Sequence, residues 1–429
     1  MSGLTDELDV LSGKPNLLVQ LPVCGLLQAL ARKHATLWKL PAPTSDLPSE
    51  KNVSGAAHQN DADVGAESVF VDDVTHELLC TNGHLESATR SCVCGMIRFV
   101  KHAAFDSGRL KGLSLLLLLA LAICLASLVS GGSGISAKQA ISALMGAGDE
   151  AARNVMMEVR LPRLLAAFGV GGLLALSGVL LQALFRNPLA DPFVMGVSGG
   201  AAVGALLAMI TGAAAAGVQS AAVLGALGAV AVVYLLARGG GTSRLLLTGV
   251  VVASACGALV SVLLALADTG RLRGMVFWLA GDLGWALSPW SSVVAAVVSA
   301  GLALVVARPL NVLAAGELRA RSVGLQIEVW RTVLFVACAS LTAIAVINAG
   351  TVGFVGLITP HAIRLAFRTS DHRVVAPASV VLGGTILATA DLLARTVASP
   401  RQLPVGAIMA LVGAPIFIAL LRGRSGRVI

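Results

Sequence analysis

The stretch that decides the fold is residues 160 to 204, which reads RLPRLLAAFGVGGLLALSGVLLQALFRNPLADPFVMGVSGGAAVG. An arginine pair leads into an apolar run that is long enough to cross a bilayer, since a membrane helix needs about 20 residues. The run ends at Arg186, where Asn187 and two prolines predict a rigid, non-helical turn. A second apolar run follows. This stretch therefore predicts two membrane helices joined by a short polar turn.

The same pattern recurs along most of the 429-residue chain, which is 56% hydrophobic and only 13% charged, with a mean hydropathy of +0.85. These values exclude a soluble enzyme. Apolar runs predict ten spans, at residues 113–129, 160–184, 193–210, 217–237, 244–267, 287–307, 326–348, 351–368, 374–397 and 405–422. The predicted fold class is an all-α membrane protein with ten transmembrane helices, preceded by a poorly structured N-terminal tail.

The basic residues predict the orientation. Residues 1–112 hold 10 Lys+Arg against 13 Asp+Glu, so the remainder holds 21 against 10, a net charge of +11. Positive charge before the first span and in every second connection predicts that both termini lie in the cytoplasm. The sequence has no basic run with interleaved aromatic residues, so it does not predict nucleic acid as a partner. The outer connections break the rule, because they carry Arg153, Arg160, Arg163, Arg271, Arg273, Arg395 and Arg401.

Small residues are abundant in the spans, and Gly196, Gly200 and Gly204 follow one another at four-residue spacing. Small side chains let helices approach closely in lipid, so this spacing favours helix packing over a ligand site. The seven cysteines are scattered and do not predict a disulfide framework.

The inner connection at residues 308–324 reads RPLNVLAAGELRARSVG and is longer than its neighbours. It is amphipathic, which predicts one or two short helices at the cytoplasmic surface. Glu317 favours a docking platform for a soluble partner, and the alternative is a solvated surface loop.

Ionisable groups inside the spans leave a second class of function open. His361 and Asp391 could couple transport to a proton or sodium gradient, because intramembrane ionisable residues mark such pathways. For Asp391, the simpler interpretation is an ion pair with Arg395, four residues further along the same helix.

Residues 1–95 differ from the rest and are predicted to be a disordered tail or not to be translated, with a natural start near Met96. Residues 96–112 form a basic cytoplasmic lead. The tail contains His76, Cys80, His84, Cys92 and Cys94, whose spacing could hold a metal, although incidental cysteine and histidine residues in a disordered tail are the favoured interpretation.

Several motifs occur together in one order: RLPR, SGVLLQALFRNPLADPFVMGVSGGA, FWLAGDL, the RPLN loop with its Gly-Glu pair, GFVGLITPHAIR and LPVGAIMALVGAPIFIALL. In this respect the chain, over about residues 108–429, resembles the FecCD family of ABC importer permeases. Val323 departs from the family pattern, which has leucine there. The resemblance implies a permease domain at residues 113–424, a cytoplasmic coupling loop at residues 308–324, and a dimer with a second copy or a sister permease.

The resemblance also implies partners and site residues. Two ABC ATPase subunits would supply ATP and Mg²⁺ chemistry, which agrees with the absence of a Walker A pattern here, and no cofactor or metal is expected on this chain. A substrate-binding protein would dock on Arg160, Arg163 and Arg395. The path or gate residues would be Asn187, Leu189 and Ser261. Contacts to the ATPase would involve Leu310, Asn311, Gly316, Glu317, Arg321 and Gly324.

The cargo is the least determined part of this prediction. A ferric siderophore is the first expectation and heme or cobalamin the alternative, because specificity in the family lies mostly with the binding protein. A gradient-driven secondary transporter is the competing class.

Overall fold

The computed structural model describes residues 107–131, 135–146, 149–286 and 289–422, and these residues form helices and connections without a strand. The predicted tail, the basic lead up to residue 106 and the candidate metal ligands of the tail lie outside the described residues. The first half contains α4 (Ser107–Val129), α5 (Ala137–Leu144), α6 (Glu150–Asn154), the π-helix η2 (Val155–Arg160), α7 (Leu161–Phe185), the 3-10 helix η3 (Pro192–Met195), α8 (Val197–Ile210), α9 (Ala215–Ala237) and α10 (Thr242–Ala265).

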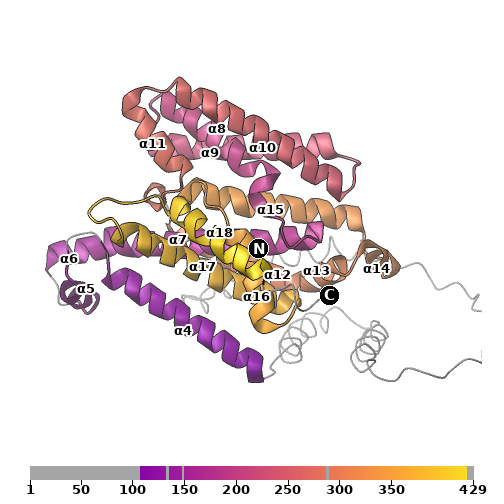
Figure 1. Cartoon of the computed structure of the whole chain (residues 1–429), viewed down its shortest axis with the longest axis horizontal. Coiled ribbons are helices and arrows are strands. Elements are labelled where there is room, and N and C mark those ends of the chain that lie inside the picture. Colours follow the sequence, from indigo (N-terminus) through magenta and orange to yellow (C-terminus); the bar gives the residue numbers. More distant parts are fainter. Residues whose placement is uncertain (1–106, 132–134, 147–148, 287–288, 423–429) are drawn as a thin grey trace, which may run out of the picture. The chain divides into compact units, whose positions relative to one another are not determined.

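The second half continues with α11 (Thr269–Leu279), the 3-10 helix η4 (Leu283–Trp285), α12 (Pro289–Val305), α13 (Ala307–Ala314), α14 (Glu317–Ser322), α15 (Ile327–Ala349), α16 (Val355–Phe367), α17 (His372–Thr396) and α18 (Val405–Arg422). Figure 1 shows most of these helices running between two ends of a bundle. One end carries α5, α6 and α11, and the other carries α13 and α14.

By length and composition, six described helices can cross a membrane, or seven if α12 and α13, bent by 65°, count as one span. These are α4, the continuous segment Glu150–Phe185, α9, α10, α15 and α17. Three shorter apolar helices, Val197–Ile210, Val355–Phe367 and Val405–Leu420, coincide with the remaining predicted spans. An all-helical membrane protein is thereby confirmed.

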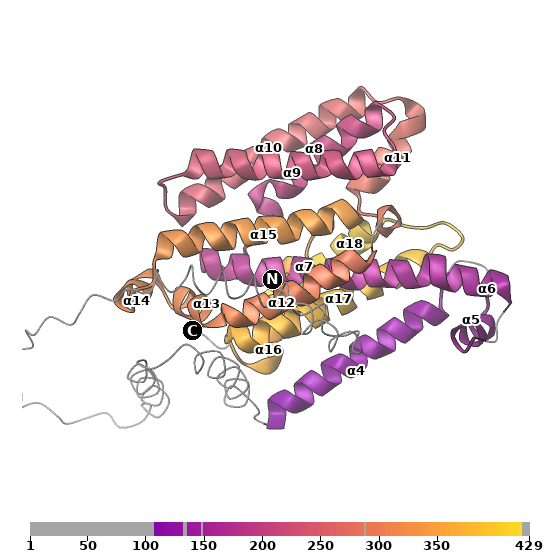
Figure 2. The ribbon, with the colours of Figure 1, turned by 180° about the vertical axis from the view of Figure 1, so that it is seen from behind.

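The centre of the bundle is α7, most of whose residues are buried. It contacts α12, α15, α16 and α17, and Figure 2 shows it between α15 and α17. Its glycines allow this close packing, since a Cβ built on Gly171 would overlap the backbone of Gly383 on α17, and one built on Gly178 would overlap Gly356 on α16.

A second group of helices, α8, α9 and α10, packs beside α15. The glycines at four-residue spacing, which were predicted to serve helix packing, have that role in this group. A Cβ on Gly200 would overlap the Gly225 carbonyl, and one on Gly204 would overlap the Ala221 carbonyl, both on α9. In contrast, α10 leaves most of its surface uncovered by this chain.

Candidate functional site

The turn between α7 and η3 has the non-helical form that its sequence predicts. Arg186 adopts a left-handed conformation with φ 49° and ends α7. The Asn187 side-chain oxygen accepts a hydrogen bond from the Leu189 backbone N–H at 2.9 Å, which closes a tight turn. This geometry turns the Leu189 side chain outward, where it is 48% exposed.

Asp191 ends this turn and begins the next helix. Its carboxylate accepts a hydrogen bond of 2.8 Å from the Phe193 backbone N–H and thereby caps η3. Burial raises the pKa of the Asp191 carboxyl, and the hydrogen bond from Phe193 opposes that rise only in part.

The coupling segment forms two short helices, as predicted. Gly316, with φ 121°, separates α13 from α14, and Gly324, with φ 77°, separates α14 from α15. Only glycine adopts such backbone angles without strain, so the two glycines fix how α14 is presented. The first turn of α14 carries Leu318, which is 87% exposed. An apolar side chain exposed to that extent beside Glu317 was not predicted from the sequence.

The predicted coupling residues divide into an anchored group and an exposed group. Leu310 is fully buried, and Asn311 donates to Asp371 at 2.8 Å and accepts from the His372 backbone N–H at 2.9 Å. These contacts fasten α13 to the start of α17. Arg321 and Gly324 are exposed.

Glu317 links three elements at this end. Its Oε1 atom lies 3.2 Å from the Arg186 guanidinium of the inner turn and 3.3 Å from the Arg331 guanidinium of α15. Arg331 in turn pairs with Glu328 at 2.7 Å. The sequence analysis singled out Glu317 as a docking residue and missed both of these partners, because they lie 131 and 14 residues away in the chain.

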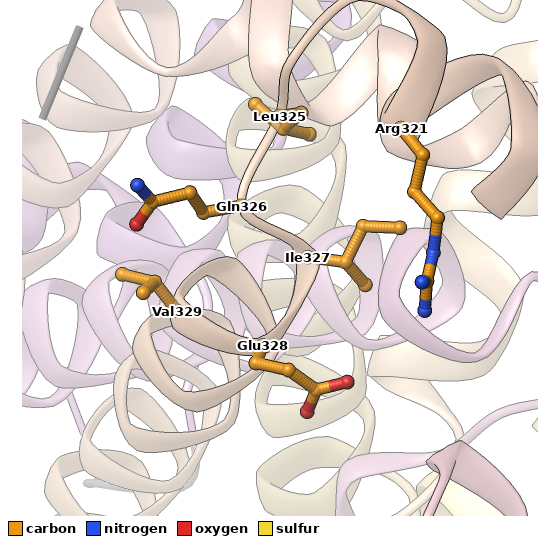
Figure 3. A pocket seen from close by; sticks show the side chains of 6 residues that line it. All are labelled: Arg321, Leu325, Gln326, Ile327, Glu328 and Val329. Carbon is orange, nitrogen blue, oxygen red and sulfur yellow. The ribbon is translucent and has the colours of Figure 1, made fainter. Parts of the chain in front are cut away.

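A shallow cavity of about 280 Å³ lies where α14 turns into α15. Figure 3 shows Arg321 extending from α14 toward the side of α15 that carries Ile327 and Glu328, whereas Gln326 and Val329 point to the other side. The cavity therefore adds a charged recess to the surface that displays Leu318.

Of the three arginines predicted at the outer face, Arg163 and Arg395 share one polar network at the opposite end of α7 and α17, and Arg160 lies beside it. Arg163 donates to Asp391 at 2.7 Å and to Gln402 at 3.1 Å, and it lies 3.5 Å from Asp282. Arg395 pairs with Asp391 at 2.9 Å. The predicted pair of Asp391 with Arg395 is therefore confirmed, and its second partner, Arg163, is new.

These arginines face inward to an extent that the sequence did not predict. Arg160 is 1% exposed and donates to the carbonyls of Leu128 and Val129 at 2.7 and 2.8 Å. Arg395 is 6% exposed and also donates to Ser127 at 2.7 Å. Each thus ties the end of α4 to the bundle. Their role in docking stays a prediction, and their role in holding α4, α7 and α17 together is what the contacts show.

Two further outer arginines have local partners that account for them. Arg271 donates to the Ile210 and Met209 carbonyls and so caps the end of α8. Arg273 lies over the Phe277 ring, with its guanidinium carbon 5.6 Å from the ring centroid.

The remaining predicted residues lie apart from both clusters. Ser261 is on the uncovered face of α10, where its hydroxyl donates to the Gly257 carbonyl at 3.1 Å. His361 is buried on α16 beside a cavity near the inner turn. No group of three or more potential metal ligands occurs within the described ranges.

The described residues thus form an apolar helical bundle with two short helices at one end and a buried arginine network at the other. The FecCD transport family model matches residues 117–423, which is more than half of the chain. The chain belongs to this family.

Two relatives that are described as import permeases are similar to this chain. The chain is 44% identical over 287 residues to the cobalamin import system permease protein BtuC of Halobacterium salinarum, covering 65% of this chain and 76% of the relative. It is 38% identical over 325 residues to the vitamin B12 import system permease protein BtuC of Klebsiella pneumoniae, covering 74% and 94%.

Among solved structures, a metal-chelate type ABC transporter in an inward-facing conformation is similar, with a TM-score of 0.64 and 32% identity over 73% of this chain and 99% of that one. The chain is thus a permease subunit of an ABC importer, in which separate partner chains supply the ATPase.

Proposed function

We propose that this chain is the membrane permease of an ATP-driven importer for cobalamin. The observation that carries the proposal is its 38% identity to a vitamin B12 permease along 94% of that relative. In this proposal all ten apolar segments cross the membrane, including the three shorter helices, and a second permease copy completes the path. The cargo differs from the first expectation of a ferric siderophore, since the curated relatives described above favour cobalamin.

The end that carries α13 and α14 faces the cytoplasm in this proposal. Support comes from the arginines gathered in the connections that the sequence places there, at 186, 238, 244, 308, 319 and 321. Both termini then lie in the cytoplasm, and the membrane is the inner membrane.

Two ATPase subunits dock on α14 and hold ATP and Mg²⁺, one on each permease copy. The exposed Leu318 gives α14 an apolar contact, and Arg321 a charged one. Glu317 then passes a displacement of α14 to the inner turn, because its carboxylate binds Arg186 beside Asn187 and Leu189. In this way a movement of the ATPase reaches the residues proposed to narrow the path.

At the other end, a substrate-binding protein docks over the arginine network. Among the described residues, Arg160, Arg163 and Arg395 lie near two carboxylates, those of Asp282 and Asp391. A carboxylate on the binding protein would compete for Arg163, whose side chain is 10% exposed. Charge-assisted pairs of this kind orient a transient encounter and raise its rate.

Uptake in intact cells tests the proposal directly. Cells with and without this chain receive labelled cobalamin, a labelled ferric siderophore or labelled heme, under ATP depletion and separately with a protonophore. We expect cobalamin uptake alone to depend on the chain and to fail when ATP is depleted. Uptake that follows the proton gradient would reject the ATP-driven importer.

The second candidate cargo is a ferric siderophore or another metal chelate, supported by the similarity to a metal-chelate type transporter. Heme is the third. Chain-dependent uptake of one of these in the same experiment, with no change in cobalamin uptake, would replace the cargo and keep the importer.

A further inference from the structure

A cavity of about 220 Å³ opens at the end of α16 and gathers positive charge and hydrogen-bond donors. It is lined by Pro188, His361, Arg364, Leu365, Arg368, Thr369 and Ser370. Two arginines and two residues with hydroxyl groups thus line one recess, and no acidic residue occurs among these described lining residues. Such a recess suits an anion with several oxygen acceptors, as a phosphate group has.

The charged walls are held in place by the surrounding structure. Arg364 donates to the Gln182 side chain at 2.6 Å, and Gln182 is itself fixed by the Gly356 carbonyl at 3.2 Å. The nearest acidic residue in sequence, Asp371, is occupied by Asn311 and by the Arg373 backbone N–H. Asp371 therefore already has partners of its own among the described residues.

Arg368 sits there against its conformational preference. It ends α16 in a left-handed conformation with φ 48°, a position at which glycine is the usual residue. It also follows Arg364 by four residues, a spacing at which like charges repel. Backbone strain of this kind is found at binding sites in other proteins, so Arg368 is the residue at which the role of the cavity is tested.

The surroundings identify the source of the phosphate as lipid. Leu365, on the cavity wall, is 54% exposed. The same end of α16 meets α4, because a Cβ built on Gly112 would lie 3.2 Å from the Phe367 ring, and both views show these two helix ends together. Most of α4 is uncovered and apolar, and its first turns carry Arg109 and Lys111. The cavity thus opens beside an apolar helix that this chain leaves uncovered and whose first turns carry two basic residues.

We infer that this cavity binds the phosphate of an anionic phospholipid headgroup, such as phosphatidylglycerol, at the membrane face that carries the inner turn. Basic pockets between membrane helices on the cytoplasmic side bind headgroups of this class. The inference does not depend on the cargo.

The test compares Arg368→Gly with Arg238→Gly in the purified full chain. Arg238 is an exposed arginine that also follows a helix end, but its φ is −53°. Thermal unfolding is followed in mixed micelles containing phosphatidylglycerol or phosphatidylcholine, and bound lipid is counted by native mass spectrometry. In phosphatidylcholine we expect Arg368→Gly to unfold at or above the wild-type temperature, because glycine relieves the left-handed strain.

In phosphatidylglycerol we expect the wild type and Arg238→Gly to gain thermal stability and Arg368→Gly to lose that gain, with about a fivefold weaker lipid affinity. Equal gains in all three proteins would overturn the inference. So would an equal gain from millimolar inorganic phosphate, which would assign the cavity to a soluble anion. Weaker binding of the ATPase subunits to Arg368→Gly with unchanged lipid retention would assign it to a protein partner. If Arg368→Gly fails to fold, Ser370→Ala replaces it under the same criteria.

Discussion

Glu317 is the α14 residue that binds Arg186, at the turn between α7 and η3. Replacing it by glutamine removes the ion pairs with Arg186 and Arg331 and keeps the size of the side chain. We expect at least a fivefold loss of uptake with ATP hydrolysis retained in the assembled transporter, because the ATPase would still dock on Leu318. Both rates are measured in the same reconstituted vesicles.

Glu328→Gln is the matched control for that experiment. Glu328 also binds Arg331, but its side chain is 74% exposed and it has no contact with the inner turn among the described hydrogen bonds and ion pairs. An exposed pair of this kind contributes little to stability. If Glu328→Gln lowers uptake as much as Glu317→Gln does, the specific link through Arg186 is wrong.

Asp391 is the residue that holds the outer network together. Its side chain is fully buried between Arg163 and Arg395. Asp391→Asn removes the carboxylate that Arg163 and Arg395 share and leaves Arg163 only Asp282, at 3.5 Å. Breaking a buried pair in this way costs about 3–5 kcal/mol. We expect that loss in the free energy of unfolding, measured by denaturant titration in detergent.

Asp282→Asn tests whether burial of the carboxylate determines the size of this loss in unfolding free energy. Asp282 meets the same arginine at 3.5 Å, but its side chain is 24% exposed. The expected loss is below about 1 kcal/mol. Equal losses of unfolding free energy in Asp391→Asn and Asp282→Asn would mean that burial does not determine the contribution of each carboxylate.

At the scale of helices, glycine sets the distance between α7 and its neighbours. Gly178 lies against the backbone of Gly356, so a methyl group there must push α7 and α16 apart. Overpacking of this kind costs about 1–3 kcal/mol, and we expect Gly178→Ala to lower the unfolding temperature. Gly228→Ala is the control, because nothing lies within 4 Å of the added carbon and α9 gains a better helix former.

The helices themselves were predictable because each span is a long apolar run. Each predicted span coincides with an apolar helix, and the span at residues 287–307 contains the whole of α12. The two short helices of the coupling segment followed from its amphipathic pattern. The ion pair of Asp391 with Arg395 followed from spacing of one helical turn.

Contacts between distant segments could not be predicted in this way. The Arg163–Asp391 pair joins residues 228 positions apart, and the Arg186–Glu317 pair joins residues 131 apart. Nothing in the local pattern around Arg160 distinguishes a buried guanidinium from an exposed one. Its burial depends on the carbonyls of Leu128, Val129 and Ile135, which accept its hydrogen bonds from 25 to 32 positions away.

For the molecule as a whole, the uncovered face of α10 indicates where a second permease copy meets this one. Ser254, Gly257 and Ser261 follow one another at near-helical spacing on that face, and nothing lies within 4 Å of a carbon added to Gly257. A stripe of small and hydroxyl side chains packs poorly against lipid chains and well against another helix. We therefore predict that Gly257→Leu leaves the subunit folded and prevents dimer formation.

The measurement is the molar mass of the purified protein by light scattering, with the unfolding temperature as a check on the fold. Gly228→Leu is the control, since it adds the same bulk to an uncovered site on α9. We expect Gly257→Leu to have the mass of one subunit and Gly228→Leu that of two. A dimer in both variants would move the contact away from α10, and with it the expected place of Ser261 on the shared path.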